Sequence, residues 1–158
     1  MADFTNCPDV RLAIPEDLNE LMRLTKMACE EDAQHSYNPQ KVYEKLLLHF
    51  NKQGGVAAVI GEKGQELKGY LLMVVDQIWY SDEWQLLELS LFVAPEHRRS
   101  TYAKQLMSFS KQASDGLQLD LTIGVLSTSR TEAKMRLYDR QFKRLGAYYG
   151  HSPAAAAE

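Results

Sequence analysis

The chain has 158 residues, of which 45% are hydrophobic and 25% charged, and its formal net charge is −3. This length suits one domain with one core, and the negative charge argues against bulk attraction to nucleic acid or to an acidic membrane. Two cysteines are too few for a disulfide framework, and the four histidines have no metal-ligand spacing, so no metal site is expected. We expect a single domain over residues 1–151, a tail over 152–158, and a cytoplasmic location, because the N-terminus lacks signal-peptide features and no apolar run could span a bilayer.

The first third of the chain predicts one strand and two helices. Residues 10–14 alternate and end at Pro15, which is typical of a short strand. From Pro15 the apolar residues recur at helical spacing, until the acidic stretch 30–38 breaks the pattern. Asn38 and Pro39 then form an N-cap and first helical position, and the second helix should end before Gly54.

Three strand-like runs follow, over residues 56–62, 67–80 and 84–93. Only a few turn residues separate them, so the sequence predicts an antiparallel meander.

The last third predicts alternating helices and strands. A helix is expected over 101–113, a strand over 117–126, and one or two short strands over 143–150. Ser129 and Glu132 have the spacing of a capping box, which predicts another helix start between these strands. The natural packing is an α/β (α+β) fold, in which a mixed sheet has helices on both faces and a parallel crossover surrounds Arg98.

The turn "PEHRRSTYA", residues 95–103, joins a buried strand to a helix. The first turn of a helix has free N–H groups and the positive end of the dipole, and Arg98 and Arg99 add charge beside it. The turn can therefore hold a phosphate or pyrophosphate. The alternative is a solvated basic turn in which Ser100 or Thr101 is a simple N-cap.

Glu88 is the single charged residue in "LLELSLFV". A carboxylate in a buried strand costs free energy unless it is paired, hydrated or used, and burial raises its pKa toward the range of a general base. The alternative is an edge glutamate that pairs with an arginine or a backbone group.

Tyr138 lies in the last predicted helix. If this helix packs beside the strand that carries Glu88, the phenol could protonate a leaving group. The alternative is an aromatic packing residue with its hydroxyl at the surface.

These features, in this order, resemble the GNAT superfamily of N-acetyltransferases over nearly the whole chain. "LELSLFVAPEHRRSTYAKQLM" is similar to the acetyl-CoA motif of that family, and "EAKMRLYDRQF" is similar to its late A-x-x-L-Y segment. The segments "PEHRRS" and "RTEAKMRLY" look most like those of phage-encoded members of the family.

The resemblance implies a mixed, mostly antiparallel twisted sheet and the transfer of an acetyl group from acetyl-CoA to a primary amine of a small molecule or peptide. Glu88 matches the family's usual general-base position, directly or through water. Tyr138 matches the tyrosine that can protonate the departing thiolate of CoA. The strand 89–93 would pair with the pantetheine arm, and amides of 99–103 would hold the pyrophosphate. The candidate acetyl-CoA-binding residues are Leu91, Phe92, Val93, Arg98, Arg99, Ser100, Thr101, Tyr102, Ala103 and Ser129.

The sequence departs from the family pattern at two places. Thr101 stands where the family has a glycine, and the glycine expected after Tyr138 is missing, so a second register would put Phe142 at the tyrosine position. These departures leave a second hypothesis, a non-catalytic protein on the GNAT scaffold such as a phage virion component. A homodimer or larger assembly, and a location in host cytoplasm or virion, belong to the same set of expectations.

Overall fold

The computed structural model describes residues 6–151. Its strands form one five-stranded sheet in the order β1-β2-β3-β4-β5. The strands are β1 (Val10–Leu12), β2 (Gly55–Ile60), β3 (Gly69–Gln77), β4 (Trp84–Val93) and β5 (Asp120–Thr122). Neighbours pair antiparallel from β1 to β4, and β4 pairs parallel with β5. The mixed, mostly antiparallel sheet predicted from the sequence is therefore confirmed.

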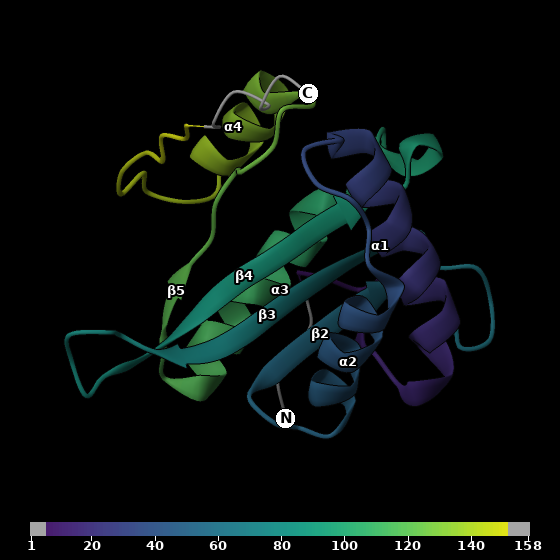
Figure 1. Ribbon diagram of the computed structural model, residues 1–158, viewed down its shortest axis with the longest axis horizontal. Helices are drawn as coiled ribbons and strands as arrows, with labels where there is room; N and C mark the ends of the chain where they lie inside the picture. The colour runs from purple at the N-terminus through teal and green to yellow at the C-terminus, as the bar shows by residue number, and fades with distance from the viewer. Residues whose placement is uncertain (1–5, 152–158) are drawn as a thin grey trace, which may run out of the picture.

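Helices cover both faces of the sheet (Figure 1). The helices are α1 (Leu18–Asp32), α2 (Pro39–Phe50), α3 (Tyr102–Leu117) and α4 (Thr131–Asp139), with short 3-10 turns η1 (Pro15–Asp17) and η2 (Pro95–His97). Helices α1 and α2 lie on one face and α3 on the other, while α4 lies beyond the end of β5 (Figure 1).

The strand alternation divides the core into two layers. In β3, Leu71 and Met73 belong to the cluster that packs against Leu106 of α3. Tyr70 and Leu72 belong to the opposite cluster, with Leu21 of α1. Because successive strand residues point to opposite faces, a strand with two covered faces must be apolar throughout.

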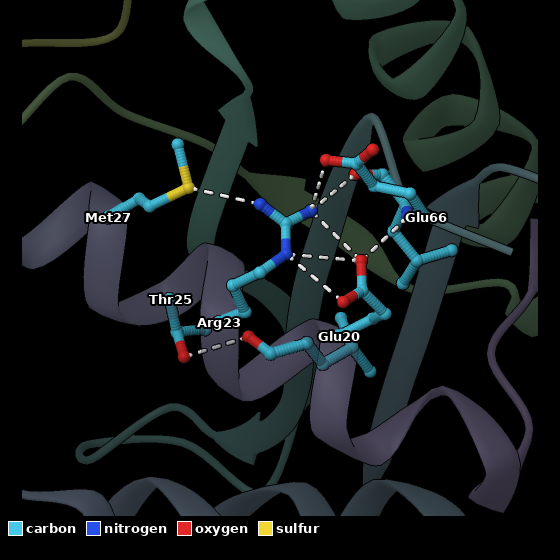
Figure 2. Close-up of polar contacts among 7 residues, drawn as sticks. Glu20, Arg23, Thr25, Met27 and Glu66 are labelled. Carbon is cyan, nitrogen blue, oxygen red and sulfur yellow. Dashed lines mark hydrogen bonds and ion pairs between the residues drawn. The ribbon is translucent and has the colours of Figure 1, made fainter.

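Arg23 and Glu20 attach α1 to the loop between β2 and β3 (Figure 2). The Arg23 guanidinium donates to the Leu67 carbonyl at 3.0 Å and pairs with Glu66 at 3.4 Å. The Glu20 carboxylate accepts from the Leu67 amide at 2.9 Å. These contacts satisfy backbone groups of Leu67, which is itself buried.

The elements predicted from the N-terminus to α3 agree with the structure, with small shifts in their bounds. The N-cap of α2 is Asn38, whose side chain accepts from the Lys41 amide, as predicted. The third predicted helix starts at Tyr102 and runs to Leu117, rather than covering 101–113.

Three predictions for the last third are wrong. The strand expected over 117–126 is only Asp120–Thr122, because its pairing with β4 stops at Thr122. The capping box of Ser129 is absent, since α4 begins after Arg130, which has positive φ and makes no side-chain cap. Residues 143–150 form no strand, and the predicted tail over 152–158 lies outside the described residues.

Candidate active site

Strands β4 and β5 pair over only the first part of β4 and then separate. Their pairing covers only Gln85 to Leu87 of β4, so the edge from Glu88 to Val93 has no strand beside it among the described residues. On the other side, Leu72 pairs with Ser90 and Met73 with Glu88, which leaves Leu89 as an extra residue in a β-bulge. A bulge bends a strand and re-aims its side chains, and this one lies directly next to Glu88.

The Glu88 carboxylate points to the segment that follows β5. Its Oε2 accepts from the Gly124 amide at 3.1 Å, and its oxygens accept from the Tyr138 hydroxyl at 2.9 and 3.1 Å. Burial raises the pKa of Glu88 to about 7, although these two hydrogen bonds act in the opposite direction. At neutral pH the group therefore divides between the acid and the carboxylate, as a general base requires.

Tyr138 comes from α4 and meets Glu88 across the gap. Burial, followed by the negative charge of Glu88, raises the pKa of the Tyr138 phenol above its ordinary value. The phenol is therefore protonated at neutral pH and can donate. Phe142, the residue of the other register, contacts the Tyr138 ring with centroids 6.1 Å apart and has no hydroxyl to offer.

The start of α3 has free backbone donors beside this gap. The Tyr102 amide donates to the Ser100 hydroxyl, and the Gln105 amide is the first to reach a helical carbonyl. Within residues 6–151, the amides of Thr101, Ala103 and Lys104 have no acceptor. These groups and the helix dipole can bind an anion.

The two arginines of the turn have different surroundings. Arg98 donates to the Val93 carbonyl at 3.0 Å, pairs with Glu31 at 2.5 Å, and lies 5.3 Å from the centre of the Phe92 ring. Arg99 is exposed, and no contact of its side chain is present in the described part of the chain. Arg98 thus joins β4 to α1, whereas the charge of Arg99 is available to a ligand.

A cavity of about 480 Å³ occupies the gap between β4, α1 and α4. Its volume is in the range of small-molecule sites. Of the sequence-predicted residues, those that line it are Glu88, Leu91, Phe92, Val93, Arg98, Ala103 and Tyr138. Those outside its lining are Arg99, Ser100, Thr101, Tyr102 and Ser129.

Thr101 and Ser129 make intramolecular contacts. The Thr101 hydroxyl accepts from the Gln105 side chain at 2.9 Å, and Gln105 is buried. The Ser129 hydroxyl donates to Glu31 at 3.4 Å. Of the two residues named in the alternative N-cap reading of this turn, the Thr101 side chain makes no cap hydrogen bond, whereas the Ser100 hydroxyl accepts from the Tyr102 amide at 3.2 Å.

The sequence analysis did not identify the contacts that hold the segment after β5 in place beside the cavity. Asp32, at the end of α1, accepts from the amide of Thr128 at 2.8 Å and from its hydroxyl at 3.3 Å. Lys134 lines the cavity and donates to the Ser127 hydroxyl. Residues 30–38 can be recognised as acidic from the sequence alone. The contact between Asp32 and Thr128 spans 96 positions, so no local pattern could indicate it.

In residues 6–151, no three His, Cys, Asp or Glu side chains gather in a way that could hold a metal ion. Over the same range, no helix has both the length and the apolar composition needed to cross a membrane.

Residues 18–142 match the model of the acetyltransferase (GNAT) family. A comparison with curated protein sequences gives no match. Similar solved structures include an integron cassette protein from the mobile metagenome of Cole Harbour Salt Marsh, with TM-score 0.73 and 19% identity over 96% of this chain and 93% of that one.

Two further solved structures carry names that specify an activity or a ligand. An aminoglycoside acetyltransferase from an uncultured soil metagenomic sample has TM-score 0.68 and 16% identity, over 93% of this chain and 98% of that one. AAC(6')-Iy, in complex with the bisubstrate analogue CoA-S-monomethyl-acetylneamine, has TM-score 0.68 and 12% identity, over 91% and 98%. At these identities the likeness shows the fold, and the names of these structures give no indication of a phage origin.

Proposed function

Because the chain belongs to the GNAT family of acetyltransferases, we propose that it transfers an acetyl group from acetyl-CoA to a primary amine. The observation that carries this proposal is the contact of Glu88 and Tyr138 at the point where β4 loses its neighbour β5. A base and an acid then face the same gap, beside a helix start that can bind phosphate.

The residues present fit acetyl-CoA. The unpaired edge of β4 from Glu88 offers backbone groups to an extended amide chain, and the free amides of Thr101, Ala103 and Lys104 are donors for a pyrophosphate. The Val93 carbonyl already accepts one hydrogen bond, from the Arg98 side chain. When bound, acetyl-CoA supplies an activated acetyl thioester.

Proton movement follows from the hydrogen bond between Glu88 and Tyr138. The amine attacks in its neutral form, since only that form is a nucleophile. Glu88 accepts the one proton that the amine nitrogen must lose as the amide bond forms and the C–S bond breaks. Tyr138 donates its phenol proton to the departing sulfur. Because the Tyr138 hydroxyl already donates to Glu88 at 2.9 Å, the proton taken by Glu88 can restore the phenol. The pair thus returns to its starting state without an external acid.

The acceptor class is a primary amine, and aminoglycosides are reasonable first candidates because solved neighbours include aminoglycoside acetyltransferases. Glu31 and Asp32 also line the cavity, but each is engaged, with Arg98 and Thr128 respectively. A cationic acceptor would therefore have to rely on Glu88 or displace one of these contacts.

Calorimetric titration with acetyl-CoA, followed by a mass-spectrometric screen of amines, tests the proposal. Aminoglycosides, polyamines, amino acids and peptide N-termini should be included in the screen. We expect saturable binding and an acetyl mass gain on at least one class. Binding without acetylation of any amine would favour the non-catalytic alternative, for which the bulk of Thr101 at the helix start is the supporting feature. Absence of both heat and thermal shift would reject the proposal.

A further inference from the structure

The hairpin between β3 and β4 exposes three large aromatic side chains. Trp79 is 92% exposed, Tyr80 74% and Trp84 53%. The segment projects from the body of the molecule, away from the helices (Figure 1). A cluster of exposed aromatic rings is uncommon on a monomer surface and is typical of an interaction site. We call residues 76–85 the aromatic tip.

The aromatic tip is an ordered turn. The Ile78 amide donates to the Glu83 carbonyl at 2.9 Å, and the Ser81 amide donates to the Ile78 carbonyl at 3.0 Å. The Trp79 and Tyr80 rings pack edge to face with centroids 5.2 Å apart. Rings held in one arrangement lose little conformational entropy when a partner binds.

The charged side chains within the aromatic tip have one sign. The aromatic tip contains Asp76, Asp82 and Glu83, and the chain has no lysine or arginine between Lys68 and Arg98. The adjacent residue of β5, paired with Gln85, is Asp120. The face of an indole or phenol ring attracts cations, and the carboxylates add to that attraction. Phosphate groups of a nucleic acid or an acidic membrane would be repelled.

The shape of the aromatic tip favours an extended partner over a small cation. None of the three rings lines the cavity between β4, α1 and α4. A small molecule gains most of its affinity by burial in a concave site, whereas a peptide can follow a projecting hairpin over several residues. We propose that the aromatic tip is a docking site for a Lys- or Arg-rich segment of a partner protein. This proposal stands independently of the acetyl-transfer function.

Tryptophan fluorescence reports this site directly, because both tryptophans of the chain, Trp79 and Trp84, lie in the aromatic tip. An oligo-arginine peptide titrated into the full chain at low salt should change the emission saturably, and high salt should weaken the effect. The double variant Asp82→Asn/Glu83→Gln should weaken the affinity about tenfold, since it removes two charges that face the peptide. Trp79→Ala should weaken it to a similar degree, with Trp84 as the remaining reporter.

Matched controls distinguish this site from general attraction to an acidic protein. Glu44→Gln/Glu62→Gln removes two charges elsewhere, and Tyr149→Ala removes another exposed ring; both should leave the affinity unchanged. The proposal is overturned if oligo-arginine produces no saturable change, if oligo-glutamate binds equally well, or if the control pair weakens binding as much as the tip pair. It is also overturned if sedimentation shows a dimer that Trp79→Ala does not form, because a second copy of the chain would then cover the rings.

Discussion

Replacing Tyr138 by phenylalanine should raise the pKa of Glu88. The Tyr138 hydroxyl donates to the carboxylate at 2.9 and 3.1 Å, and this bond stabilises the charged form. A hydrogen bond to a charged group is worth about 1.5–3 kcal/mol, and about 1.4 kcal/mol equals one pKa unit. The pKa of Glu88 should therefore rise from about 7 by roughly one unit, since the Gly124 amide still donates and water can enter.

Carbon-13 NMR of the glutamate carboxyls across a pH titration measures this shift without any substrate. Tyr148→Phe is the matched control, because Tyr148 lines the same cavity and its hydroxyl makes no hydrogen bond within the described residues. An unchanged or lowered pKa of Glu88 in Tyr138→Phe would refute the proposed coupling of the two groups, as would an equal shift in the control.

Three further outcomes follow from the same contacts. Because the folded-state pKa of Glu88 lies above its ordinary 4.5, stability is lost as pH rises through about 7 and the carboxyl ionises. Glu88→Gln should therefore raise the free energy of unfolding by about 3 kcal/mol at alkaline pH and by nothing below both pKa values, as measured by urea denaturation. Arg99→Ala should weaken acetyl-CoA binding about tenfold or more in calorimetry, since the Arg99 charge is free; an unchanged affinity would place the anion site elsewhere. Asp32→Ala removes the acceptor of Thr128 and should accelerate amide hydrogen exchange over 123–130 while sparing α3; equal protection would show that Asp32 does not hold this segment.

The elements up to α3 could be predicted because their hydrophobic periodicity is strong and their ends carry local signals. Asn38 and Pro39 begin α2 as expected, and the buried residues of β3 alternate between two covered faces. Such patterns require no knowledge of distant neighbours, because the period itself indicates which side faces a core.

The last third could not be predicted in the same way, because its structure depends on partners far along the chain. Residues 117–126 look like a long strand, yet β5 ends where β4 diverges from it. Ser129 has capping-box spacing, but its hydroxyl contacts Glu31 instead of an α4 amide. Residues 143–150 include Tyr148 and Tyr149, which are both exposed, and this segment forms no strand.

The candidate site divides along the same line. Glu88 stands out in the sequence as a charge in an apolar strand, and this feature alone predicts a perturbed carboxyl. Its contact with Tyr138 spans 50 positions and could be expected only from the family resemblance. The Gly124 amide and the Asp32 contact carry no residue-type signal, since a backbone donor has no sequence signature.

The most direct test of the account is the pH dependence of kcat/KM for acetyl transfer to an identified amine, in the wild type and in Glu88→Gln. The wild type should lose activity as pH falls through about 7, the pKa of Glu88 in the free protein. Glu88→Gln should be slower by about 10²–10⁴-fold above that pH and should lack this limb, with acetyl-CoA affinity little changed. A variant that keeps the wild-type rate and the same acidic limb would contradict the assignment of Glu88 as the base.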